Sequence, residues 1–206
     1  MSTVESKSPA GMREKLAECA FDLFALRGFR SVNLDQITSQ AGVTKGSLYW
    51  HYKSKKELIL AACDLYYQNW FARTDEEIEQ AGDDVVAALR GVLRFSVISC
   101  LFDRKNRVFT TEVFALSLQD ADVRESWAGF YQGVRTRFIQ LVEAVNDAGK
   151  LSVTPPSQAV DMMLSAIEGI KLRAVFEPEI CEQDGIDGFV ESLLKIVSAS
   201  NIKLSV

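Results

Sequence analysis

The sequence has few residues that interrupt helices. Its 206 residues include four prolines, and none lies between Pro9 and Pro155, so residues 10–154 contain no strong helix breaker. No stretch shows the sustained alternation of apolar and polar residues that predicts a half-buried strand. Apolar residues instead recur at three- and four-residue spacing through most of the chain. We therefore expect an all-α protein.

Residues suited to catalysis or metal binding are also scarce. There is one histidine, His51, and the four cysteines lie far apart, without a C-x-x-C pair or the Cys/His spacing of a zinc site. P-loop, G-x-S-x-G and H-E-x-x-H motifs are missing. We expect no enzymatic activity, no metal and no cofactor, and we interpret the cysteines as buried thiols in a reducing cytoplasm.

Sequence signals for export or membrane insertion are weak as well. Residues 1–10 are polar and lack the apolar core of a signal peptide. The most apolar stretch, residues 85–102, is interrupted by Arg90 and Arg94. We therefore expect a cytoplasmic protein that does not span a membrane.

An overall excess of positive charge is absent too. The chain has 23 basic and 28 acidic residues, and its net charge of −5 taken alone argues against a nucleic-acid partner. The charge is unevenly distributed, however. Residues 1–60 hold nine basic and six acidic residues, a net charge of +3, whereas the remainder holds 14 basic and 22 acidic residues, a net charge of −8. Only the N-terminal segment suits phosphate, which predicts weak non-specific binding to DNA.

Turn and capping signals divide the chain into about nine predicted helices. Gly42 marks a sharp turn, and Asn33 with Gln36 and Ser54 with Glu57 have the spacing of capping boxes. The helices are expected at about residues 11–27, 33–41, 44–52, 54–80, 83–102, 108–118, 122–146, 157–176 and 186–200.

Residues 34–52 have the pattern of a helix-turn-helix motif. The apolar residues that would face inward are Leu34, Ile37, Ala41, Val43, Leu48 and Tyr52. The outward face of the second helix carries ammonium, hydroxyl, aromatic and imidazole groups, which suit phosphates, base edges and thymine methyls. These outward residues are Lys45, Ser47, Tyr49, Trp50 and His51.

The stretch from Arg13 to Leu58 resembles the DNA-binding domain of the TetR/AcrR family of transcriptional regulators. The matching residues are Phe24, Gly28-Phe29, Ala41-Gly42-Val43, Gly46-Ser47-Leu48-Tyr49 and Lys53-Ser54-Lys55. The resemblance implies a helix-turn-helix DNA-binding domain at residues 1–54 and a helical ligand-binding and dimerisation domain at residues 55–206. It further implies a ligand-responsive repressor, which binds a palindromic operator as a homodimer and is released by a small-molecule effector. An effector-independent regulator or a transcriptional activator stays open as the alternative.

The family pattern also implies roles for single residues at double-stranded DNA. Hydroxyls at Thr44 and Ser47 and the ammonium of Lys55 would bind phosphates, whereas Lys45 and Tyr49 would reach base edges or a thymine methyl. Trp50 and His51 would contact the DNA backbone, although a solvated surface histidine is the alternative at position 51. The full implied set is Thr44, Lys45, Gly46, Ser47, Tyr49, Trp50, His51 and Lys55.

The last two long helices are the expected dimer interface. They carry more apolar residues than one face of a lone helix buries, and in the family such a pair forms a four-helix bundle with its partner. A purely intramolecular core is the alternative. The predicted interface residues are Met163, Ile167, Ile170, Phe189, Leu193 and Leu194.

The middle helices are expected to surround a ligand cavity. Aromatic residues at helical spacing are usually core, and polar groups on otherwise apolar stretches are better indicators of a binding site because their burial requires a partner. This mixture predicts an apolar or aromatic effector with one or two polar groups. The predicted lining residues are Trp70, Phe95, Ser99, Phe109, Glu112, Trp127 and Tyr131.

Overall fold

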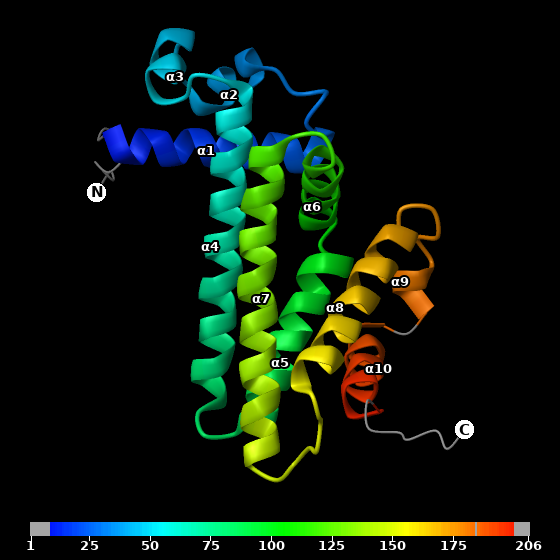
Figure 1. The fold of residues 1–206 in the computed structure, drawn as a ribbon. Helices are drawn as coiled ribbons and strands as arrows, with labels where there is room; N and C mark the ends of the chain where they lie inside the picture. Colours follow the sequence, from blue (N-terminus) through cyan, green and yellow to red (C-terminus); the bar gives the residue numbers. More distant parts are fainter. Residues whose placement is uncertain (1–8, 184, 200–206) are drawn as a thin grey trace. The chain divides into compact units, whose positions relative to one another are not determined.

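The computed structural model describes residues 9–183 and 185–199, and every regular element in these ranges is helical (Figure 1). The predicted all-α fold is confirmed. The elements are α1 (Pro9–Arg27), α2 (Leu34–Ala41), α3 (Lys45–His51), α4 (Lys55–Ala81), α5 (Val85–Val97), the π-helical turn η2 (Ile98–Phe102), α6 (Arg104–Ser117), α7 (Ala121–Asp147), α8 (Pro156–Arg173), α9 (Ile180–Gln183) and α10 (Gly185–Ala199).

The junction between α5 and α6 differs from the prediction. The expected break at residues 103–107 is one residue long, because the Asp103 carboxylate accepts the Asn106 amide at 3.1 Å and α6 starts directly after it. Residues 98–102 are a π-helical turn, in which the Asp103 amide donates to the Ile98 carbonyl at 2.8 Å. The Arg107 guanidinium donates to the Leu101 carbonyl at 2.8 Å and so satisfies a carbonyl in this turn.

The C-terminal boundaries also differ. α8 ends at Arg173, three residues before the predicted end, and Pro178 then prevents a simple continuation of the helix. The short helix α9, which the periodicity did not predict, starts after this proline, with the Cys181 amide donating to the Pro178 carbonyl at 3.2 Å. The last helix was predicted to end at residue 200, which lies outside the described residues.

The chain divides into two compact units. The first contains residues up to Asn69 together with Val108–Trp127, and the second contains Trp70–Arg107 and the chain from Ala128 onward. α4, α6 and α7 therefore contribute residues to both units. The predicted domain boundary at residues 54 and 55 coincides with the start of α4 and stays a prediction.

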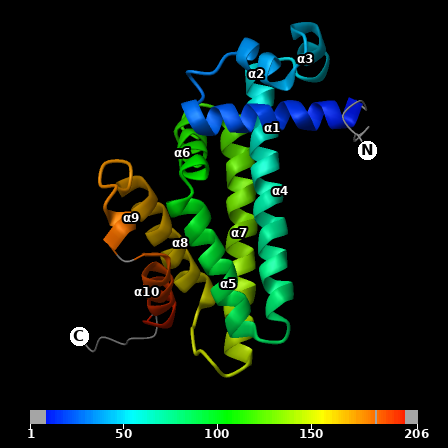
Figure 2. The same ribbon diagram turned by 180° about the vertical axis from the view of Figure 1, so that it is seen from behind.

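The core of the first unit joins α6 to α1, to the turn after α1 and to α4 through Phe109. This side chain is fully buried, and its ring lies 4.7 Å from the Phe21 ring of α1, 5.7 Å from the Phe29 ring and 5.9 Å from the Tyr66 ring of α4. α2 and α3 lie together on one side of α1, near the N-terminal end of α4 (Figures 1 and 2). α6 thus shares one core with α1 and α4, the helices before and after the motif.

In the second unit, α8 and α10 lie side by side (Figure 1). Apolar side chains from both helices fill the space between them, and each is less than one tenth exposed. These residues are Met163, Ile167, Phe189 and Leu193. Four of the six predicted interface residues therefore belong to the core of one protomer, whereas Ile170 and Leu194 are half-buried.

Val85–Phe102 is long and apolar enough to cross a membrane, with a mean hydropathy of 1.9. A helix in the core of a folded domain can have the same length and composition, so the contacts of this stretch decide between a membrane span and a core helix. α5 packs against α10, and its two arginines form ion pairs with that helix, Arg90 with Glu191 and Arg94 with Asp187 at 3.3 Å. The stretch thus has the contacts of a core helix of the second unit.

Candidate nucleic-acid interface

The turn between α2 and α3 is held by the predicted caps. The Asn33 side chain accepts the Gln36 amide at 3.0 Å, and the Gln36 side chain accepts the Asn33 amide at 2.9 Å, which completes a capping box. Gly42 ends α2 in the left-handed conformation with a φ of 68°, where a residue without Cβ is favoured. The Val43 amide then donates to the Thr38 carbonyl at 3.0 Å. The direction of α3 relative to α2 is set by these contacts.

The inward face of α3 is anchored by Leu48 and Tyr52, whose side chains are 0% and 1% exposed. The Tyr52 hydroxyl donates to the Arg13 carbonyl of α1 at 3.0 Å, and the Arg13 guanidinium lies 4.8 Å from the centre of the Tyr52 ring. Burial raises the pKa of Tyr52, and the charge of Arg13 opposes this rise. These anchors fix the rotation of α3 and hence the face that it presents to solvent.

The opposite face of α3 is open to solvent. Trp50 is 67% exposed and Tyr49 is 47% exposed, and the Trp50 ring meets the His51 ring edge-on at 4.7 Å. At the start of the helix, the Thr44 hydroxyl accepts the Ser47 amide at 3.2 Å as an N-cap. Exposed rings beside hydroxyl and ammonium groups on one short helix suit the base edges and phosphates of a DNA major groove.

Lys55 is placed differently from the other residues of the implied DNA-binding set. Its ammonium donates to the Phe29 carbonyl, so it holds the turn that follows α1. Burial lowers the pKa of Lys55, and the nearby Glu112 carboxylate opposes this fall. A phosphate contact by Lys55 stays a prediction, and it requires the ammonium to leave the Phe29 carbonyl.

Sequence reasoning did not single out Asp35, which also lies on this surface. Its carboxylate is 2.6 Å from the Lys45 ammonium, and the two side chains are 61% and 60% exposed. Asp35 is in the first turn of α2 and Lys45 is the first residue of α3, so the pair bridges the two helices of the motif. A search for oppositely charged residues at the starts of adjacent helices would have found it.

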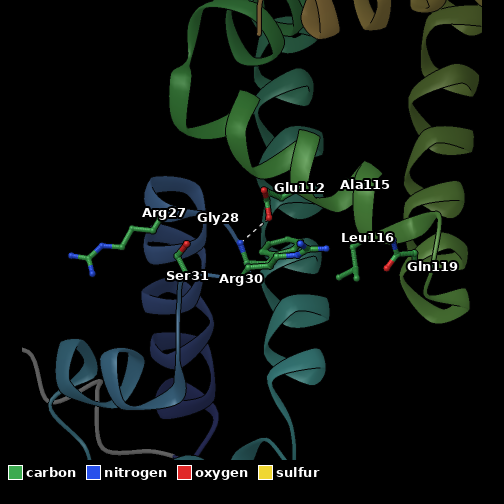
Figure 3. A pocket seen from close by; sticks show the side chains of 9 residues that line it. Arg27, Gly28, Arg30, Ser31, Glu112, Ala115, Leu116 and Gln119 are labelled. Carbon is green, nitrogen blue, oxygen red and sulfur yellow. Dashed lines mark hydrogen bonds between the residues drawn. The ribbon is translucent and has the colours of Figure 1, made fainter. Parts of the chain in front are cut away.

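Glu112, which was predicted to contact a ligand, lines a cavity of the first unit. The cavity has a volume of about 450 Å³ and is bordered by the turn after α1 and by α6. The Glu112 carboxylate points toward that turn and accepts the Phe29 amide at 2.8 Å (Figure 3). Arg27, Arg30 and Gln119 also line this cavity. In this structure the Glu112 carboxylate therefore binds the backbone of the turn after α1.

The other predicted ligand-binding residues are distributed over both units. Phe109 and Trp127 belong to the first unit with Glu112, whereas Trp70, Phe95, Ser99 and Tyr131 belong to the second. Trp70 packs in the core against Phe130, with ring centroids 5.8 Å apart. The buried Ser99 hydroxyl accepts the Asn106 side-chain amide at 3.1 Å. A ligand-binding role for these residues stays a prediction.

Residues 16–62 match the family model described as bacterial regulatory proteins, tetR family. The chain is similar to the HTH-type transcriptional repressor KstR2 of Rhodococcus jostii, with 27% identity over 135 residues, which is 61% of this chain and 66% of that protein. The matched segments cover 19%, 47% and 23% of the first three curated relatives, so the chain spans at most about half the length of each.

Solved structures share the fold over most of the chain. A TetR transcription regulator from Haloarcula marismortui superposes with a TM-score of 0.80 at 15% identity, covering 92% of this chain and 98% of that one. A SmeT–triclosan complex superposes with a TM-score of 0.72 at 22% identity, covering 94% of this chain and 92% of that one. Both structures share the fold of this chain, in which α3 has an exposed face. Residues 16–62, which contain the helix-turn-helix motif, are similar to the tetR family of bacterial regulatory proteins.

Proposed function

We propose that this protein is a cytoplasmic, sequence-specific DNA-binding repressor without enzymatic activity. The observation that carries the proposal is the exposed face of α3, where Tyr49 and Trp50 face solvent although Leu48 and Tyr52 anchor the same helix. Lys45 and Tyr49 contact base edges, and Trp50 and His51 contact the DNA backbone. The name of the relative KstR2 supports repression, and activation remains the alternative, because the position of the operator decides between them.

The repressor binds a palindromic operator as a homodimer, since one short helix contacts only a few base pairs. An exposed stripe on α8 and the turn after it supports this assembly. Met162, Leu172 and Phe176 are 60%, 40% and 70% exposed, and the exposed Ser165 and Gly169 lie between them at three- and four-residue spacing. Small residues within an apolar stripe let a second helix approach closely, so this stripe meets its copy in the partner.

A small effector releases the dimer from DNA. The triclosan in the complex with SmeT supports an effector that is aromatic and carries few polar groups. Effector binding shifts the free-energy difference between the DNA-binding state and the released state of the dimer by about 1–3 kcal/mol, which is typical of allosteric coupling. A regulator without an effector is the second candidate, and a ligand screen separates the two.

The proposal is tested by selecting binding sites for the purified protein from a random pool of duplexes. Enrichment of a palindrome with half-sites about 10 base pairs apart, or a multiple of that spacing, is expected. A pool without an enriched sequence contradicts the proposal. In parallel, a panel of aromatic compounds is screened for a rise in Tm and for release of the selected duplex. Compounds that bind the folded state raise Tm, and failure of every compound favours the effector-independent regulator.

A further inference from the structure

The ion pair between Asp35 and Lys45 places an acceptor beside a donor at the junction of the two motif helices. The two side chains lie 2.6 Å apart, and each is about 60% exposed. Their helices are held by the buried residues Ile37, Ala41 and Leu48, so the backbone at both positions is fixed. The base-contacting groups of such a motif come from the first residues of its second helix, where Lys45 lies.

Stability does not account for this pair. Exposed ion pairs contribute little to folding, because solvent screens them and two long side chains must be ordered. A lysine in the first turn of α3 also opposes the helix dipole, since the N-terminal end of a helix favours negative charge. The start of α2 is already capped by Asn33 and Gln36. Asp35 in the first turn of α2 interacts favourably with the helix dipole, but this interaction needs no partner at Lys45. A carboxylate on a surface that faces phosphates lowers non-specific affinity, and a role in specificity accounts for its pairing with a lysine.

The major groove edge of a G·C pair fits this arrangement of groups. Guanine presents two adjacent acceptors, N7 and O6, and cytosine presents the N4 donor beside them. The Lys45 ammonium has three donors for the guanine acceptors, and the Asp35 carboxylate accepts from cytosine N4. In an A·T pair, the adenine N6 donor lies between two acceptors, so the thymine O4 repels a carboxylate placed there. The pair therefore selects G·C by attraction and rejects A·T by repulsion.

We propose that Asp35 and Lys45 together recognise one G·C base pair in each operator half-site, with Lys45 on guanine and Asp35 on cytosine. The inference rests on the proposed DNA-binding function. It adds an acidic specificity-determining residue on α2 to the basic and aromatic residues of α3. It also predicts two outcomes that together distinguish it: removal of the carboxylate relaxes the base preference at one position and strengthens binding to unrelated DNA.

The test uses the full-length protein and the duplex selected from the random pool. Affinities at one salt concentration are measured for this duplex and for all single base-pair changes in the half-site, with the wild type, Asp35→Asn and Lys45→Met. The control is Glu18→Gln, which removes one negative charge from an exposed position in α1. Tm values of all variants verify that they fold.

The wild type is expected to prefer G·C at one position by roughly 5- to 150-fold. In Asp35→Asn and Lys45→Met, the preference for G·C at this position falls to within about 3-fold, and the base preferences at the other positions persist. Glu18→Gln keeps the base preferences of the wild type at every position. Binding of Asp35→Asn to random duplex becomes tighter. The inference is overturned when the wild type is specific but Asp35→Asn keeps every preference or loses affinity uniformly. A wild type without any base preference overturns the proposed function itself.

Discussion

The Glu112 carboxylate of α6 accepts a hydrogen bond from the backbone amide of Phe29 at 2.8 Å, across 83 positions of the sequence. The Lys55 ammonium of α4 donates to the carbonyl of the same residue. Both backbone groups of Phe29 are thus held by oppositely charged side chains from two other helices. The turn that leads from α1 into the helix-turn-helix motif is therefore tied to α4 and to α6.

Replacement of Glu112 by alanine is expected to lower the free energy of unfolding by about 1.5–3 kcal/mol. A hydrogen bond to a charged group contributes roughly this amount, and the partly buried Lys55 ammonium also loses a nearby negative charge. Glu112→Gln keeps an acceptor and is expected to cost less. Urea denaturation measures both, with Glu125→Gln at an exposed position of α7 as the control. Equal stability of Glu112→Ala and the wild type would show that the bond contributes nothing.

Two glycine-to-alanine changes are expected to have opposite effects. Gly28 has a φ of +76°, and a Cβ there would lie 3.1 Å from a Glu112 carboxylate oxygen, so Gly28→Ala is destabilising by about 1–2 kcal/mol. Gly129 is helical, with no atom within 4 Å of a new Cβ, and Gly129→Ala stabilises α7 by up to about 1 kcal/mol. Thermal unfolding of both variants gives the signs, and a stabilising Gly28→Ala would contradict the structure of this turn.

The sequence predicted the helices well where local chemistry determines them. Asn33 and Gln36 form their capping box because both partners lie within one turn. The hydrogen bond of Glu112 to Phe29 had no such local signal, since it joins residues brought together only by the core around Phe109. The π-helical turn at Ile98–Phe102 was missed for a related reason, because the Arg107 guanidinium that bonds to its Leu101 carbonyl lies beyond the turn itself.

Stability is expected to fall above pH 9 because of the thiols of the buried Cys63 and the half-buried Cys100. Burial raises the pKa of Cys63 from 9.0 to about 12 and that of Cys100 to about 11. Between pH 9 and these values the unfolded state has lost the thiol proton and the folded state retains it. The stability that each thiol contributes is therefore fully present below pH 9. It falls by about 1.4 kcal/mol per pH unit between pH 9 and the pKa of that thiol in the folded state. Urea denaturation from pH 8 to 10.5 should show a flatter decline for Cys63→Ala, and an unchanged decline contradicts this assignment.

The exposed stripe on α8 gives a prediction about assembly. Leu172→Glu is expected to convert the dimer to a monomer at micromolar concentration without unfolding it, because Leu172 is 40% exposed within one protomer. Ile167→Glu instead unfolds the protein, because Ile167 is 3% exposed and the change buries a carboxylate in the core. Sedimentation velocity and circular dichroism distinguish the two outcomes, with the exposed Glu143→Lys as the charge-changing control. A dimeric Leu172→Glu variant would place the interface elsewhere.

Apolar pattern alone did not separate the interior of a protomer from the exposed stripe on α8 that we propose as the dimer interface. Met163 and Ile167 have the same apolar character as Met162 and Leu172, and the packing of α10 and η2 against α8 decides which of them are buried. Charge pattern had a similar limit at the surface that we propose binds DNA. Asp35 and Lys45 can be found in the sequence as opposite charges at the starts of adjacent helices, but the 2.6 Å between their charged groups depends on the turn that joins α2 to α3.

The most direct test of DNA recognition by α3 is the affinity of Tyr49→Ala for the selected duplex at fixed salt. Tyr49 is 47% exposed and its side chain is not part of the core, so the variant keeps the Tm of the wild type. Phe114→Ala, which removes an exposed ring of α6, serves as the control. The expected result is a roughly 5- to 150-fold loss for Tyr49→Ala and no loss for Phe114→Ala. Equal affinity of Tyr49→Ala and the wild type would contradict recognition through this face of α3.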